Sequence, residues 1–161
     1  RKFKAAKIEV TYYKNEKVLS VKLPSGRPMF YHAPRISEKI VKDKEGNERN
    51  EGASFSYLGR LGAKEQGTVG RVWGWGGKWT ENVVQATARD CLTSSMLRID
   101  QEIDYADLVL HTHDEIGCEV DEGLAQRCYD RMHDLMVDLP PWAKGLPIEC
   151  KGWVGRRYRK D

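Results

Sequence analysis

The sequence has little that would place the chain in a membrane, a disulfide framework or a zinc site. No apolar run approaches the ~20 residues that a membrane-spanning helix needs, and the pattern leads us to expect no signal peptide. The four cysteines form no C-x-x-C pair, which disfavours zinc ribbons and thiol redox motifs. Cys91, Cys118 and Cys128 stand among apolar neighbours, so we expect reduced, buried thiols in a cytosolic protein.

A strong excess of one charge is also lacking, since the net charge is only +3. The basic residues nevertheless gather at both ends, in residues 1–7 and 151–160. These ends are predicted either to lie near a polyanion or to be solvated tails. The chain begins at Arg1 without an initiator Met, which suggests a fragment or a processed product.

The length and the aromatic content favour one folded domain. A chain of 161 residues is long enough to bury a core. Five Trp and seven Tyr argue against disorder, although 32% of the residues are charged. We therefore treat residues 1–161 as one domain with a β-rich part, 1–75, and a mixed part, 76–161.

The β-rich part shows the period-two alternation of strands, interrupted by turn residues. Asn15-Glu16 and Pro24-Ser25-Gly26 offer turns, while 43–52 contains no apolar residue and predicts a solvated loop or hairpin tip. The 59–67 segment is expected to connect the last two strands. The predicted strands, which would form a β-meander and hairpins, are 8–12, 18–23, 29–31, 54–58 and 68–75.

The mixed part begins with a helix for which Thr80 is the expected N-cap and Glu81 a favourable first-turn acid. A polar stripe, Asn82, Gln85 and Arg89, lies opposite the apolar one. The apolar stripe at spacings of three and four comprises Val84, Ala88, Cys91, Ser95 and Ile99.

A hairpin follows, with strands predicted at 108–113 and 116–120. Asp121 should cap a second helix that ends at Pro140-Pro141, and 148–154 should return as a strand. The order of elements predicts an α+β fold in which helices cover one face of a mostly antiparallel sheet. The core stripe expected on the second helix is Leu124, Cys128, Met132, Leu135 and Met136.

Two adjacent carboxylates, Asp114 and Glu115, stand at the expected hairpin turn, where Gly or Asn is usually preferred. Adjacent carboxylates repel each other, and a divalent cation would relieve that repulsion. A solvent-facing acidic turn is the alternative. A zinc hydrolase built on His111 and His113 is disfavoured, because the remaining histidines have no partner acid in a comparable motif.

The polar helix stripe could hold duplex DNA of any sequence. Amide groups such as those of Asn82 and Gln85 can donate to purine N3 and pyrimidine O2 in the minor groove. Arg89 and Lys78 would add phosphate contacts. A merely solvated helix face is the alternative.

Four segments in order resemble the C-terminal palm of the family A DNA polymerases, in particular the phage and prophage branch. They are LPSGRPMFY (23–31), GGKWTENVVQATARDCL (76–92), LVLHTHDEIGCEV (108–120) and LPPWAKGLPIECKGWVGRRYRK (139–160). The resemblance spans nearly the whole chain. It implies a DNA-directed DNA polymerase that binds primer–template DNA and a dNTP, acts in a bacterial cytoplasm and uses Mg²⁺.

The resemblance also implies roles for individual residues. Asp114 matches a catalytic metal ligand, Glu115 lies beside the metals, and His113 approaches the primer terminus. Gln85 matches a glutamine that contacts the minor groove.

Two parts of the family pattern are missing. They are a second metal-binding Asp, in an Asp-Tyr-Ser-x-x-Glu strand motif, and a fingers helix that grips the nucleotide. Asp104-Tyr105 is followed by Ala106 and is read as a loop. We therefore expect the chain to be inactive alone and to need segments from the same precursor or from a second chain. A non-catalytic basic DNA-binding or scaffolding module is the alternative.

Overall fold

The computed structural model describes residues 2–5, 7–61 and 67–159, and for 2–5 it gives the backbone alone. The described elements form two antiparallel sheets and two α-helices, with short 3₁₀ turns. The α+β class and the mostly antiparallel sheet are thereby confirmed. The chain divides into two compact units, Arg1–Gln85 and Ala86–Asp161. Within the described residues, no helix is both long and apolar enough to cross a membrane.

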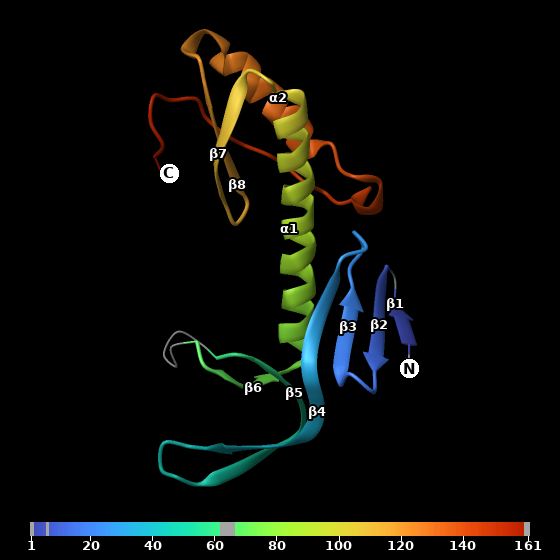
Figure 1. Cartoon of the computed structure of the whole chain (residues 1–161). Helices are drawn as coiled ribbons and strands as arrows, with labels where there is room; N and C mark the ends of the chain where they lie inside the picture. The colour runs from blue at the N-terminus through green and yellow to red at the C-terminus, as the bar shows by residue number, and fades with distance from the viewer. Residues whose placement is uncertain (1, 6, 62–66, 160–161) are drawn as a thin grey trace. The chain divides into compact units, whose positions relative to one another are not determined.

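The first unit is a six-stranded antiparallel meander in which each strand pairs with the next one along the chain (Figure 1). The predicted meander is confirmed. Residues 62–66 of the expected 59–67 connection lie outside the described residues. The strands are β1 (Lys2–Ala5), β2 (Ile8–Tyr13), β3 (Val18–Lys22), β4 (Pro28–Lys42), β5 (Glu48–Arg60) and β6 (Val69–Gly74).

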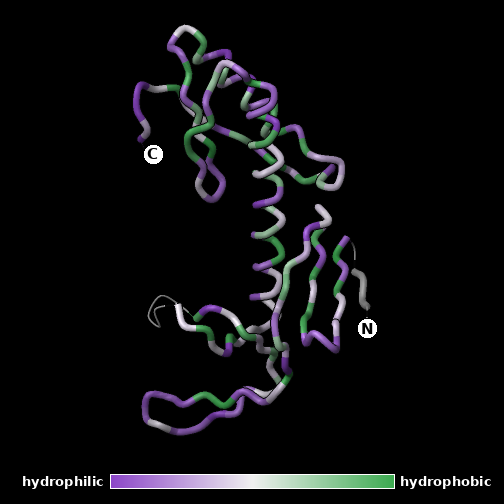
Figure 2. Tube along the Cα trace, in the orientation of Figure 1, coloured by the Kyte–Doolittle hydropathy of each residue, from purple (hydrophilic) through white to green (hydrophobic). Residues whose placement is uncertain are grey.

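Strands β4 and β5 form a long hairpin with a polar tip (Figure 2). The tip is tight, because the Asp43 carboxylate accepts the backbone N–H groups of Glu45 and Asn47, each at 2.9 Å. These bonds lower the pKa of Asp43. The predicted hairpin tip is confirmed, but it is shorter than 43–52, since strand β5 already begins at Glu48. Charged residues pair across the hairpin there, as in Lys39–Glu51 at 2.7 Å, so no apolar residue is needed.

Helix α1 (Gly76–Glu102) begins earlier than predicted. Thr80 is not its N-cap, because its hydroxyl donates to the Gly76 carbonyl from within the first turns. The carbonyl of Trp75 accepts from the N–H groups of Lys78 and Trp79. Tertiary packing explains the earlier start. The Trp79 ring lies edge-on to Tyr31, Phe55 and Tyr57, with centroids 4.4 to 5.5 Å apart, and this fixes the first turn on the sheet.

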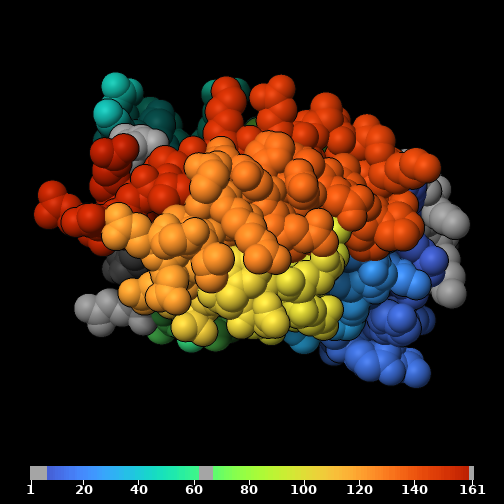
Figure 3. Space-filling view, turned by 90° about the horizontal axis from the view of Figure 1, so that it is seen from above, coloured from blue at the N-terminus to red at the C-terminus, as the bar shows by residue number. Residues whose placement is uncertain are grey.

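The second unit contains the remainder of α1, a two-stranded sheet and α2. In Figure 3 the side chains of α2, coloured orange, pack against the yellow C-terminal turns of α1. Ile99, Ile103, Cys128 and Leu135 form the buried centre, against which Met132 and Met136 also pack. The elements are β7 (Ala106–Thr112), β8 (Glu115–Val120), the 3₁₀ turn η2 (Glu122–Leu124), α2 (Ala125–Val137) and the 3₁₀ turn η3 (Pro141–Ala143).

The apolar stripes were predicted well near the core and less well away from it. Cys91, Ser95 and Ile99 are buried on α1, but Val84 is 60% exposed and Ala88 is also exposed. The predicted α2 stripe is confirmed for its core members, while Leu124 is half-buried. A helical period identifies a face, but burial of that face depends on which elements reach it.

Two local predictions in this unit are wrong. Asp121 makes no side-chain cap, and the chain forms the turn η2 before α2 begins. Residues 148–154 form no strand among the described residues. This segment packs against α2 through side chains instead: the sulfur atoms of Cys150 and Met136 lie 3.5 Å apart, and Gly152 passes close to the Tyr129 ring. A strand needs a partner backbone, and β7 and β8 pair only with each other.

All four cysteines are free thiols, as expected. Cys91 and Cys128 are buried, whereas Cys118 and Cys150 are half-buried. Burial raises the pKa of each thiol, and that of Cys118 rises to about 11 with further contributions from Cys128 and Asp107. Raised pKa values keep these thiols protonated and unreactive, which fits a structural role.

Candidate functional site

The turn between β7 and β8 carries the acidic pair, with one correction to its position. Thr112 pairs with Glu115, so the two turn residues are His113 and Asp114, and Glu115 already belongs to β8. The prediction had placed Asp114-Glu115 between the strands. This one-residue displacement gives the two carboxylates different environments. Asp114 is exposed at the tip, whereas Glu115 is half-buried in the strand.

His113 adopts a backbone conformation that side chains rarely take, with φ at +31°. A two-residue hairpin needs positive φ at the first turn residue when its twist is to match the strands, and Gly is preferred there. A histidine at such a position costs of order 1 kcal/mol. Because a glycine would relieve this strain, the strain indicates that the imidazole side chain of His113 has a use at this position.

Asp114 is the less constrained of the two neighbouring acids. Among the described residues, no hydrogen bond or ion pair reaches its carboxylate. Both oxygens of such an exposed carboxylate can coordinate an external cation or accept hydrogen bonds from a ligand.

Glu115 is held from the C-terminal segment, a contact that sequence reasoning missed. The hydroxyl of Tyr158 donates to Glu115 Oε2 at 3.1 Å. This hydrogen bond raises the pKa of Tyr158, with further contributions from burial and from the negative charge of Glu115. Arg156 pairs with Glu122 at 3.0 Å, so two side chains attach the basic segment to this unit. Lys160 and the basic residues of 1–6 lie outside the described side chains.

Arg89 connects the polar stripe of α1 to the strand that leads into the turn. Its Nη1 lies 3.2 Å from Nδ1 of His111, one residue pair away from the turn. The contact needs the unprotonated Nδ1 as acceptor. His111 was predicted only to flank the acids, and the structure gives it this positioning contact.

The other three residues of the predicted DNA-binding set belong to the first unit. Asn82 is half-buried and its amide lies 3.4 Å from the Tyr31 hydroxyl, so it contributes to the sheet–helix packing. Gln85 donates to Glu81 at 3.2 Å, and Lys78 pairs with the same carboxylate at 3.1 Å. Gln85 and Lys78 are exposed, and such surface contacts are easily exchanged for a ligand.

The described residues contain no cluster of three or more His, Cys, Asp or Glu side chains arranged to hold a metal ion. Asp114 and Glu115 therefore offer two carboxylates without a third protein ligand. Such a donor set suits Mg²⁺, which keeps several waters and is commonly held by one or two carboxylates together with substrate phosphates. Within the described part of the chain, these two carboxylates are an incomplete set of metal ligands.

The hydrogen bond between Tyr158 and Glu115 should change the pKa of the Tyr158 hydroxyl. We expect Tyr158 to ionise above its ordinary value of 10.0, and Glu115→Gln to return its pKa toward that value. Because the folded-state pKa is raised, the stabilisation is fully present below pH 10 and is lost as the pH rises through the folded value. ¹³C NMR of tyrosine-labelled chain measures this titration. Glu122→Gln, at the other anchor, should leave it unchanged, and an unaltered titration in Glu115→Gln would contradict the assignment.

A comparison with known proteins finds a similarity to a phage DNA polymerase. Over 152 residues the chain is 38% identical to a protein named DNA polymerase from Bacillus phage SP02. The match covers 94% of this chain but only 21% of that polymerase, so the chain spans about a fifth of the relative's length. No family model matches the sequence, and no solved structure matches the fold. The similarity therefore connects nearly all of this chain to a part of a phage DNA polymerase.

Proposed function

We propose that this chain is the C-terminal palm portion of a family A, DNA-directed DNA polymerase. The observation that carries the proposal is the exposed Asp114 carboxylate at a hairpin tip, in a chain similar to a phage DNA polymerase over nearly its whole length. In this proposal residues 1–161 form one palm portion, with a β-rich part, 1–75, and a mixed part, 76–161. The polymerase would act in a bacterial cytoplasm.

Asp114 and Glu115 are proposed to hold Mg²⁺ on one side of the reacting phosphate. When bound, two Mg²⁺ ions would stabilise the attacking primer hydroxyl and the departing pyrophosphate. Asp114 is the main ligand, because it is exposed and its oxygens are free of hydrogen bonds and ion pairs within the described residues. Glu115 lies beside it and is oriented by the Tyr158 hydroxyl.

His113 and the polar stripe of α1 are proposed to bind the DNA. His113 is exposed next to Asp114, and its imidazole can donate a hydrogen bond to the primer end. Gln85 is the proposed minor-groove donor, with Arg89 and Lys78 on phosphates. Asn82 is proposed as a weaker contact, because its half-buried amide already serves the packing of Tyr31.

The proposed reaction needs more than this chain supplies. Two Mg²⁺ ions about 4 Å apart need carboxylates from two segments, and adjacent residues of one hairpin cannot surround both ions. The proposed partners are therefore a segment with a second metal-binding Asp and a fingers helix for the dNTP. They would come from the same precursor or from a second chain.

Reconstitution tests this proposal. We expect the chain alone to bind Mg²⁺ weakly, in the millimolar range typical of open carboxylate sites, and to extend no primer. Addition or co-expression of a chain with the second Asp strand and the fingers helix should restore extension of a labelled primer. Robust extension by the 161-residue chain alone would refute the partial-site proposal, and failure of the two chains to associate would refute the two-chain version.

A further inference from the structure

A hollow in the first unit, at residues far from the acidic turn in the sequence, is lined by two tryptophans, two cationic side chains and one carboxylate. Its volume is about 400 Å³, within the usual range for ligand pockets. Strands β4, β5 and β6, which lie side by side in Figure 1, supply Lys39, Arg49, Glu51 and Trp73, and Trp75 follows β6.

Trp75 is unusually open for so large an apolar side chain, with 73% of its surface exposed. A tryptophan that buries its ring contributes more to stability than almost any other residue, so an exposed ring is a candidate contact for a ligand. Trp73, at 37% exposure, lines the same hollow. The hollow therefore presents flat aromatic surface to solvent.

The backbone of Trp75 is held in place, and its exposed ring lies against the start of α1. Its carbonyl accepts the first hydrogen bonds of α1, from the backbone N–H groups of Lys78 at 2.9 Å and Trp79 at 3.3 Å. The ring lies against Gly77 so closely that a Cβ there would stand 1.8 Å from a ring carbon. Gly77 is thus required for this close approach. A ring held in this way loses little conformational entropy when a ligand stacks on it.

The charges beside the rings favour an anionic ligand. The Glu51 carboxylate is neutralised by Lys39 at 2.7 Å, and both Lys39 and Arg49 lower its pKa. Arg49 is exposed and makes no hydrogen bond or ion pair of its own within the described residues. A flat apolar surface with an exposed guanidinium beside it matches the base and the phosphate of a nucleotide.

We propose that this hollow binds an unpaired nucleotide of single-stranded DNA, with its base on Trp75 and its phosphate on Arg49. A duplex is excluded as the direct ligand, because its bases are stacked on each other and offer no free face. The hollow shares no residue with the acidic turn, and its binding does not require the polymerase reaction. Only the choice of DNA over RNA rests on the proposed function.

Binding of a fluorescent oligodeoxythymidylate to the 161-residue chain, followed by anisotropy, tests the proposal. Stacking of one base on an aromatic ring changes affinity roughly 5- to 100-fold, so Trp75→Ala should weaken binding about tenfold and Trp75→Phe less. Arg49→Gln should weaken binding and reduce the slope of log K against log salt by about 0.7. Free dTMP should bind much more weakly, and the affinity for duplex DNA should not change when Trp75 is replaced.

Matched control variants distinguish binding in the hollow from nonspecific binding to other exposed rings and cations. Gly77→Ala should displace the Trp75 ring and weaken binding, whereas Gly76→Ala, where a Cβ meets open space, should not. Phe30→Ala removes another exposed ring, at 55% exposure, and Lys42→Gln removes a cation from the same hairpin. Both should bind as the unaltered chain does.

Several results would overturn the proposal. Equal affinity of Trp75→Ala and the unaltered chain would show that the ring does not stack on a base. Preference for RNA, or a hollow that only another polypeptide occupies, would reject single-stranded DNA as the ligand. Asp114→Asn should leave this binding intact, so failure of the polymerase proposal and failure of this one give different results.

Discussion

Asp114→Asn in a polymerase that contains this chain is expected to lower the rate of primer extension by roughly 10³-fold or more, with little change in DNA affinity. The substitution keeps the shape of the side chain but removes the charge that would hold the cation. A loss of that size corresponds to about 4 kcal/mol of transition-state stabilisation, typical for removal of a major electrostatic contact. Single-turnover extension of a labelled primer measures the rate, and anisotropy measures the affinity.

Asp104→Asn provides the matched control. Asp104 is also an exposed aspartate in a turn, at the opposite end of β7, and the same charge is removed. We expect it to retain nearly full activity. If Asp114→Asn retained the activity of the Asp104 variant, the metal site would lie elsewhere. Loss of DNA affinity together with extension would favour a DNA-binding role for the turn over a catalytic one.

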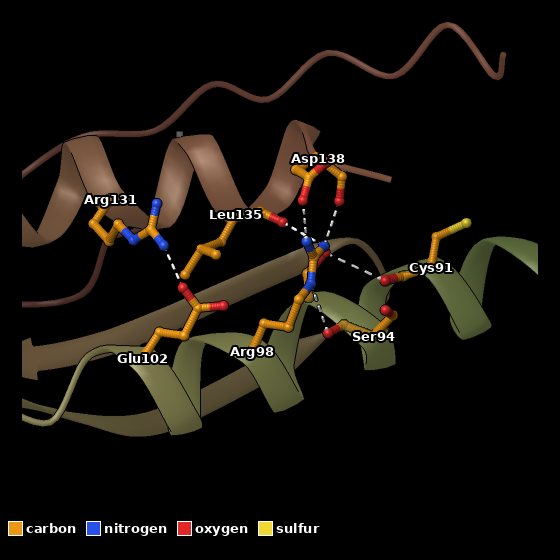
Figure 4. A network of polar contacts seen from close by, with 8 residues as sticks. Cys91, Ser94, Arg98, Glu102, Arg131, Leu135 and Asp138 are labelled. Carbon is orange, nitrogen blue, oxygen red and sulfur yellow. Dashed lines mark hydrogen bonds and ion pairs between the residues drawn. The ribbon is translucent and has the colours of Figure 1, made fainter. Parts of the chain in front are cut away.

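Arg98→Met is expected to destabilise the second unit by about 2 to 3 kcal/mol. Arg98 extends from α1 to the C-terminal end of α2, where it satisfies carbonyls that the helix itself leaves without donors (Figure 4). Its guanidinium donates to the Leu135 carbonyl and the Asp138 carboxylate, each at 2.7 Å, and to the Asp138 carbonyl. Methionine keeps the volume but provides no donor. Urea denaturation measures the change.

A second arginine on the same interface supplies the comparison. Arg131 pairs with Glu102, but their side chains remain 46% and 40% exposed, so the pair is well solvated. Arg131→Met should therefore lower the free energy of unfolding by less than about 1 kcal/mol. The loss of stability in Arg98→Lys should fall between those of Arg98→Met and Arg131→Met, because an ammonium group cannot reach three oxygens as the planar guanidinium of arginine does. Equal unfolding midpoints for Arg98→Met and Arg131→Met would contradict this account.

Part of the candidate site could be predicted from the sequence. The acidic pair and the polar stripe stand out because residue type and spacing are visible in the chain itself. The exact turn was misplaced by one residue, since strand register depends on backbone pairing that propensity does not fix. The Tyr158 contact had no local signal, because it joins residues 43 positions apart.

By itself, the sequence determined the meander of the first unit, the β7–β8 hairpin, the core stripe of α2 and the acidic turn, because these follow from local periodicity and turn chemistry. The tertiary structure decided the rest. Packing of Trp79 on the sheet set the start of α1 at Gly76. The lack of a free partner strand left 148–154 without β-structure among the described residues. Contacts between distant segments depend on the path of the whole chain, and no local pattern contains that path.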